Sequence, residues 1–98
     1  MTEDLYTWSG RYFGYRDGDD LWTFEGRHVG RFYGYDAFDP EGRYLGEIRN
    51  GFYLIRDTRK STVIRGRFAP REKRPEAIRH VDHMGFNVPN GYQDFPRL

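Results

Sequence analysis

Short alternations of apolar and polar residues, separated by glycine-containing turns, run through the first two-thirds of the chain. Stretches such as Leu21-Trp22-Thr23-Phe24 are rich in aromatic and β-branched residues and are interrupted by polar ones. Runs of this kind, bounded by Gly, Asn and Asp, predict β-strands. We expect eight strands in an up-and-down meander, over residues 4–8, 11–16, 20–24, 27–32, 36–39, 43–49, 52–56 and 59–65.

The pattern recurs with a period of 16 residues, and each copy carries the motif G-R-x-x-G. Three copies of the motif are complete, and their residues are Gly10, Arg11, Gly14, Gly26, Arg27, Gly30, Gly42, Arg43 and Gly46. A worn fourth copy begins at Phe52 and places Arg59 in register with Arg43. The four units fill roughly residues 4–69.

A unit of 16 residues holds two short strands and two tight turns, and it is too short for a helical repeat or a propeller blade. One turn of each unit falls at Ser9-Gly10, Glu25-Gly26 and Glu41-Gly42; the other falls at Asp17-Gly18, Tyr33-Gly34 and Asn50-Gly51. Asp-Gly and Asn-Gly are strong hairpin signals, because type I′ turns need positive φ at both central residues.

Eight short strands in an open meander would leave two unpaired edges, and closure into a barrel removes both. We therefore expect a single all-β domain, a small closed or nearly closed up-and-down barrel with pseudo-fourfold symmetry. An ordinary open antiparallel sheet is the alternative. In the barrel, the arginine of each unit would stand at one end and form a ring of Arg11, Arg27, Arg43 and Arg59.

The 16-residue G-R-x-x-G unit, with its D-G and N-G turns, resembles the four-fold β-flower group of small bacterial proteins. The resemblance covers roughly residues 4–69 and implies a shallow barrel with internal pseudo-symmetry. It implies no established reaction, so it bears on the fold and not on the function.

The composition changes after Phe68, because four of the five prolines follow and the motif does not recur. We expect a four-repeat β domain over residues 1–69 and an irregular proline-containing tail over 70–98. Pro and Glu suit a first helical turn, so the sequence also allows a short helix over 75–82. We expect part of the tail to pack back on the barrel, because it carries Met84, Phe86, Val88, Tyr92, Phe95 and Leu98. A disordered tail with a partner-binding motif is the alternative.

The chain is polar overall but rich in aromatic residues. Its mean hydropathy is −0.93, yet 18% of its 98 residues are Phe, Trp or Tyr, which argues against disorder. Cysteine is absent, which excludes disulfides and thiolate metal sites. The chain opens with acidic residues and contains no long apolar run, so we expect a cytoplasmic protein.

The formal charge of +1 is unevenly distributed along the chain. Residues 1–57 hold 11 acids and 7 bases, whereas residues 58–98 hold 4 acids and 9 bases. A cluster of bases can neutralise several phosphates at once, so nucleic-acid binding through the 59–79 segment is one functional hypothesis. The candidate binding residues are Arg59, Lys60, Arg65, Arg67, Arg71, Lys73 and Arg74. A solvated basic strand and linker is the competing interpretation.

Residues that could carry catalysis or bind a metal are sparse. His80 and His83 have a spacing that two metal ligands use, but no further ligand stands at a recognisable distance. Asp17, Asp19 and Asp20 fit a hairpin turn better than a calcium loop. Catalysis needs residues in different roles, whereas this chain repeats the same residues. We expect no catalytic residue, no metal and no cofactor, and we expect the protein not to be an enzyme.

The aromatic residues provide the leading functional hypothesis. A very small barrel cannot hold all of them inside, and exposed aromatic patches usually mark a partner, a second subunit or lipid. We therefore expect a non-catalytic module that binds a protein partner or a second copy of itself through an aromatic surface. Nucleic-acid binding and association with a lipid surface are the alternatives. The aromatic surface is sealed either by the tail or by a symmetric dimer.

Overall fold

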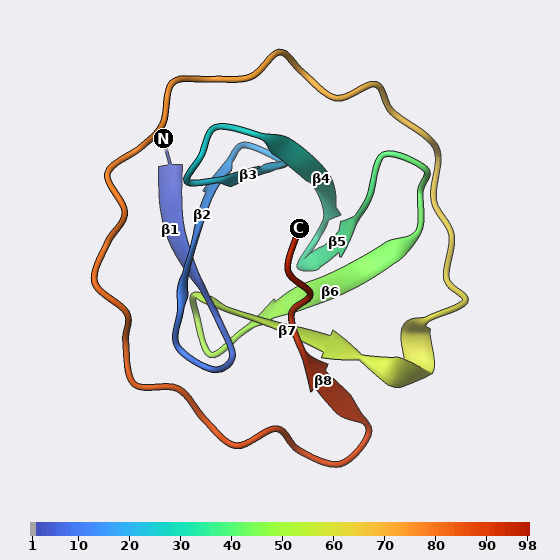
Figure 1. The fold of residues 1–98 in the computed structure, drawn as a ribbon. Coiled ribbons are helices and arrows are strands. Elements are labelled where there is room, and N and C mark those ends of the chain that lie inside the picture. The colour runs from blue at the N-terminus through green and yellow to red at the C-terminus, as the bar shows by residue number, and fades with distance from the viewer. Residues whose placement is uncertain (1) are drawn as a thin grey trace.

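The computed structural model describes residues 2–98, and it is a β-barrel without an α-helix in that range. The strands pair antiparallel in chain order, and β1 and β7 also pair in parallel, which closes β1–β7 into a ring with β8 beside β7 (Figure 1). This confirms the predicted all-β barrel. The elements are β1 (Thr2–Thr7), β2 (Tyr12–Asp17), β3 (Asp20–Thr23), β4 (His28–Tyr33), β5 (Asp36–Phe38), β6 (Tyr44–Arg49), β7 (Tyr53–Asp57), a 3₁₀ turn η1 (Thr58–Lys60) and β8 (Tyr92–Asp94). Over residues 2–98 no helix has the length and apolar character needed to cross a membrane.

Two kinds of turn separate the strands, one at each end of the barrel. At the end that we call the mouth, Gly18 and Gly34 begin two-residue turns with φ of 61° and 64°. The residue after each glycine has negative φ, so these are not the type I′ turns that the sequence suggested. The third mouth turn has one residue more, and it begins at Asn50, which has φ of 52°. This extra residue shifts the fourth copy out of the 16-residue register.

Each of the first three repeats contains a β-bulge at the same position. The strand register shifts opposite Leu5, Leu21 and Ala37, and the extra residues of the bulged strands are Phe13, Val29 and Leu45. A bulge bends its strand and increases the local twist, which a barrel of such short strands needs in order to close. All six of these side chains belong to the buried core.

The fourth repeat differs from the prediction. No strand forms over 59–65. The range begins inside η1 instead, and β8 from the far end of the chain pairs with β7. Asp94 pairs with Ile55, as His28 pairs with Trp22, so Phe95 takes the bulge position of the fourth repeat. Phe95 is 4% exposed and lies against Phe13. The C-terminal strand therefore supplies the core residue that the worn copy lacks.

The segment between η1 and β8, residues 61–91, encircles the barrel as an extended belt (Figure 1). The short helix allowed over 75–82 does not form. Its backbone N–H groups go to the barrel instead: the Arg74 N–H donates to the Gly26 carbonyl at 2.8 Å, and the Ala77 N–H donates to the Phe24 carbonyl at 2.7 Å. A helix over these residues would lose both bonds.

The belt has a period of its own, of nine residues. The N–H groups of Arg65, Arg74 and His83 donate to the carbonyls of Gly42, Gly26 and Gly10 at 2.8, 2.8 and 2.7 Å. Three residues further along in each case, Phe68, Ala77 and Phe86 donate to Pro40, Phe24 and Trp8. Nine residues of extended belt thus span one 16-residue repeat of the barrel. The belt meets the repeats in reverse order.

Candidate functional site

The belt covers a row of aromatic side chains on the outside of the barrel. Leu5 and Leu21 point inward, and the next residues, Tyr6 and Trp22, are also buried, at 5% and 1% exposed. Successive strand residues face opposite sides of a sheet, so these rings lie on the outer face and owe their burial to the belt. Phe38 occupies the same position in the third repeat.

Two of these aromatic positions hold an arginine of the belt. The Arg74 guanidinium carbon lies 3.8 Å from the centre of the Trp22 ring, and its Nη1 lies 3.0 Å from Asp17 Oδ2. The Arg65 guanidinium carbon lies 5.3 Å from the Tyr33 ring and 5.7 Å from the Phe38 ring. Stacking of a guanidinium on an aromatic face is favourable because the ring quadrupole attracts the cation.

The third position is built differently. His83 stands where the other belt units have arginine, and its imidazole stacks on Tyr6 with the ring centres 3.9 Å apart. Phe52 lies beside both rings, 5.8 Å from Tyr6 and 5.6 Å from His83. An open hollow of about 410 Å³ remains next to this cluster, and its lining adds Glu3, Asp4 and Gly51.

A second hollow adjoins the first. It has a volume of about 490 Å³, is lined by Tyr6 and by belt residues 78–83, and shares Tyr6 and His83 with its neighbour. On the belt beside it, Ile78 and Val81 are each 86% exposed. We call the surface formed by Tyr6, Phe52, Ile78, Val81 and His83 the Tyr6 face.

Acidic groups set the electrostatics of the Tyr6 face. Burial, together with the charge of Asp4, raises the pKa of Tyr6, so its hydroxyl is neutral at ordinary pH. The Tyr12 hydroxyl donates to Asp4 Oδ1 at 2.9 Å, and His80 Nδ1 lies 3.7 Å from Asp4 Oδ2. Within residues 2–98, Glu3 has no salt-bridge partner.

His28 fastens the belt at the second repeat. Its side chain is buried, its Nδ1 accepts the N–H of Arg71 at 2.9 Å, and its Nε2 lies 3.0 Å from Asp20 Oδ1. Burial lowers the pKa of His28, although the charge of Asp20 acts in the opposite direction. The neutral imidazole is therefore the form that holds the belt.

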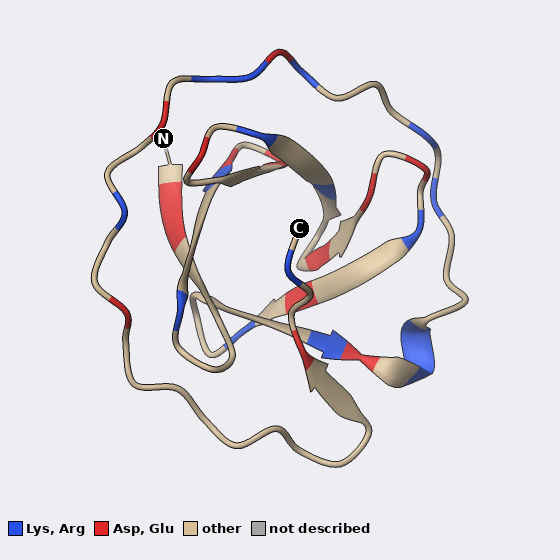
Figure 2. Ribbon diagram, viewed as in Figure 1, with Lys and Arg blue, Asp and Glu red and all other residues tan. Residues whose placement is uncertain are grey.

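The predicted basic segment runs around the barrel, whose strands carry acidic residues (Figure 2). Of its seven candidate residues, four pair with carboxylates of strands β2, β3, β5, β6 and β7: Arg59 with Asp57, Lys60 with Asp36 and Glu47, Arg71 with Asp20, and Arg74 with Asp17. Arg65 stacks on rings, and Arg67 and Lys73 are exposed. Bases from the second part of the chain thus pair with acids from the first part, and these ion pairs hold η1 and the belt on the barrel.

Glu47 shows how this pairing works at a buried position. It is 6% exposed and accepts hydrogen bonds from the Tyr44 hydroxyl, Arg49 Nε and Lys60 Nζ at 2.9, 2.8 and 2.9 Å. Burial by itself would raise the pKa of Glu47, but the three donors outweigh it and lower the pKa. Lys60, the last residue of η1 before the belt, is thereby fixed to β6.

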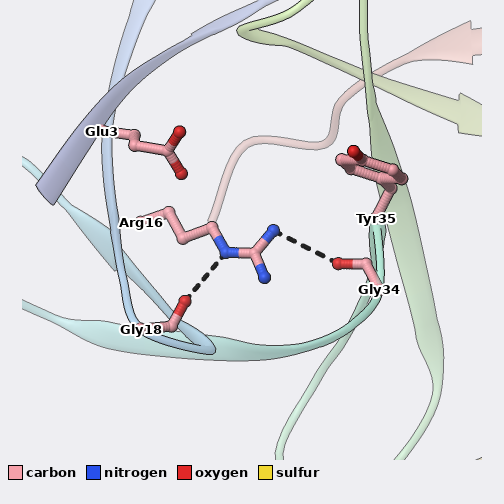
Figure 3. A pocket seen from close by; sticks show the side chains of 5 residues that line it. All are labelled: Glu3, Arg16, Gly18, Gly34 and Tyr35. Carbon is pink, nitrogen blue, oxygen red and sulfur yellow. Dashed lines mark hydrogen bonds between the residues drawn. The ribbon is translucent and has the colours of Figure 1, made fainter.

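The mouth of the barrel holds an open depression of about 640 Å³ (Figure 3). Arg16 lies in it, where the other repeats have Phe32 and Ile48, and its side chain is 17% exposed. Its Nε donates to the Gly18 carbonyl at 2.8 Å and its Nη1 donates to the Gly34 carbonyl at 3.2 Å. Its guanidinium carbon lies 4.4 Å from the Phe32 ring. Arg16 thus links the Gly18 and Gly34 turns by hydrogen bonds and covers the Phe32 ring of the core.

The motif residues have structural positions. Gly10, Gly26 and Gly42 are buried under the belt with φ of 98°, 93° and 87°. Arg11, Arg27 and Arg43 follow these turns at one end of the barrel, whereas Arg59 lies in η1 and does not complete the expected ring. The remaining motif glycines, Gly14, Gly30 and Gly46, lie in strands β2, β4 and β6.

The histidines do not form a metal site with other residues. His80 stacks on Tyr12 and His83 stacks on Tyr6, so the two rings bind to different barrel positions. Over the part of the chain that the structure describes, no group of three or more His, Asp or Glu side chains is arranged to hold a metal ion. Sequence reasoning overlooked the role of these rings as belt anchors. The nine-residue spacing of Arg65, Arg74 and His83 was the available signal.

Comparisons with known proteins agree with this architecture. No curated protein and no solved structure matches the chain significantly. The family model described as "4-fold beta flower protein" matches residues 1–88 and so includes most of the belt as well as the barrel. The chain therefore belongs to the 4-fold beta flower protein family.

Proposed function

We propose that the protein is a non-catalytic binding module that docks a partner polypeptide on the Tyr6 face. The observation that carries this proposal is the meeting of two hollows at the stacked rings of Tyr6 and His83, beside two apolar side chains left in solvent. Contiguous apolar surface on a small protein, rimmed by polar groups, is typical of interaction sites. Ile78 and Val81 bury little of their apolar surface against residues 2–98, so packing within that part of the chain does not explain their apolar character.

The belt geometry supports a polypeptide as the partner. Residues 78–83 form neither helix nor strand, and they line the second hollow together with Tyr6. Two adjoining hollows suit a partner segment that lies across the surface and places successive side chains in them.

Nucleic acid is less well supported, because most of the bases in the 59–79 segment already contact acids or rings of the same chain. A phosphate backbone would have to compete with these internal partners.

Selection from a phage-displayed library of random peptides against the full-length protein tests the proposal. We expect selected peptides to bind Ile78→Asp and Val81→Asp variants at least 10-fold more weakly than wild type. Both side chains are 86% exposed, so the substitutions should leave the fold intact. Tyr35→Ser is the matched control, because Tyr35 is 71% exposed on the mouth turn. Peptides that bind all four proteins equally would contradict the proposal.

A second copy of the chain is the other outcome to test. Sedimentation of the wild-type protein at twice 11.7 kDa, with a return to the single mass in the Val81→Asp variant, would identify the partner as the protein itself.

A further inference from the structure

The barrel contains three equivalent aromatic positions, and the chain itself shows what two of them bind. In the second repeat the rings of Trp22 and Tyr15 receive Arg74, and in the third the rings of Phe38 and Tyr33 receive Arg65. Each arrangement consists of two rings and one guanidinium. At the second repeat a carboxylate, Asp17, also pairs with the guanidinium.

The first repeat also combines rings with acidic residues, but the belt places a histidine and not an arginine on the ring. Tyr6 and Phe52 are the two rings, and Glu3 and Asp4 line the hollow beside them. His83 reaches the face of Tyr6, but over residues 2–98 no salt bridge joins it to either acid. About 410 Å³ of open space adjoins His83, the two rings and the two acids, so the belt side chain at this repeat leaves room for a longer one.

We propose that this hollow binds an arginine side chain of a partner protein, which supplies the guanidinium that the belt omits at the first repeat. The proposal rests on the proposed binding function and specifies its chemistry. Charge complementarity favours this occupant: Glu3 is exposed and has no salt-bridge partner within residues 2–98, although it lies opposite Arg16 in the sheet. A guanidinium is planar, so it can stack on Phe52 while it donates to a carboxylate. Lysine offers a point charge and no plane, and the belt uses arginine at both filled positions.

The belt provides a matched probe. A capped peptide of residues 72–78, which contains Arg74 and ends before Arg79, has the sequence that fills the second position. Its counterpart has Arg74 replaced by citrulline, which keeps the shape and removes the charge. We expect the arginine peptide to shift the ring resonances of Tyr6, Phe52 and His83 in full-length protein. The citrulline peptide should bind at least 10-fold more weakly.

Two variants of the protein test the same point from the other side. His83→Arg places the missing guanidinium on the belt, so it should occupy the hollow and abolish peptide binding while the protein stays folded. Glu3→Gln should weaken binding several-fold, and Glu25→Gln, at an exposed turn away from the hollow, should not.

The outcomes separate this inference from the proposed function. Equal binding of the arginine and citrulline peptides, or undiminished binding by a folded His83→Arg variant, would overturn the arginine site. Library peptides that depend on Ile78 and Val81 would still support a binding module in that case. Loss of that dependence would overturn both proposals.

Discussion

The carbonyl oxygen of Arg74 lies directly over the α-carbon of Gly26, in the place where any other residue would carry its Cβ. The Arg74 N–H donates to the Gly26 carbonyl at 2.8 Å, so the two residues are in contact through their main chains. Gly42 and Gly10 have the same relation to Arg65 and His83. The first glycine of each G-R-x-x-G motif is therefore the residue on which the main chain of the belt packs.

This contact predicts that Gly26→Ala will detach the belt at the second repeat. The new Cβ meets backbone atoms of Arg74, and φ of 93° adds strain. We expect a loss of about 3 kcal/mol or more in the free energy of unfolding, from the strain and two hydrogen bonds. Gly18→Ala is the control: φ is 61° but nothing lies within 4 Å of the added Cβ, so about 1–2 kcal/mol is expected. If urea unfolding showed the same loss of stability in both variants, the contact between Gly26 and the belt would not contribute to stability.

Phe95 should contribute more to stability than its place near the C-terminus suggests. Its ring is 4% exposed, lies 5.1 Å from the Phe13 ring, and fills space that a Cβ on Gly46 would enter. Phe95→Ala should cost about 3–5 kcal/mol, as expected for a large side chain removed from a core. Phe86→Ala, at 46% exposed, should cost clearly less. The comparison requires denaturant unfolding of both variants, and a smaller loss for Phe95→Ala would show that β8 does not complete the core.

Acidification should weaken the protein through His28. Its pKa is lower in the folded state, so the unfolded chain takes up a proton first as the pH falls below about 6.5. The contribution of the neutral imidazole is present above that pH and is lost as the pH falls towards the folded value, because a protonated Nδ1 cannot accept the Arg71 N–H. Tyr occupies this position in the first and third repeats, so His28→Tyr is the matched variant.

The measurement is the urea midpoint at pH 7.5 and at pH 5.5. We expect the wild type to lose more stability than His28→Tyr across this interval. A parallel decline of the two proteins would assign the pH dependence to other groups.

Binding to duplex DNA should show a shallow dependence on salt. Of the seven predicted bases, only Arg65, Arg67 and Lys73 lack a carboxylate partner within residues 2–98. Three phosphate contacts give a slope of log K against log salt of about −3, whereas seven free bases would give about −6. Fluorescence anisotropy with a labelled duplex over a range of salt concentrations distinguishes these values. A slope near −6 would show that the belt releases its internal partners for nucleic acid.

The barrel could be predicted because its signals are local. Glycine at fixed spacing marks positions of positive φ, and alternating side chains mark strands, so the hairpins follow from neighbouring residues. The fourth copy could not be placed in the same way. Residues 62–64 are Thr-Val-Ile, a good strand sequence, but β8 takes the edge of β7 that they would need. Competition between distant segments for one edge leaves no local trace.

We expected part of the tail to pack back on the barrel, but its course as an encircling belt could not be predicted, for a related reason. The hydrogen bonds that recur along the belt run between main-chain groups, and any residue except proline can donate such a bond, so they leave little pattern in the sequence. The stacked side chains carry a pattern, but His83 differs in chemistry from Arg65 and Arg74, which occupy the same position in the other two repeats. The Tyr6 face could not be predicted either, because it forms only where residues 78–83 of the belt lie beside Tyr6 of β1.

The mismatch between nine belt residues and sixteen barrel residues restricts how such a protein can evolve. Tandem duplication of a gene segment would add a complete hairpin, yet it would lengthen the ring without lengthening the loop that encircles it. A matching insertion would be needed at the same time in the belt, far downstream in the gene. Its place would also differ, because the belt meets the hairpins in the reverse of their order along the chain. Once a belt of this kind had arisen, the number of hairpins was fixed by the length of the chain that surrounds them.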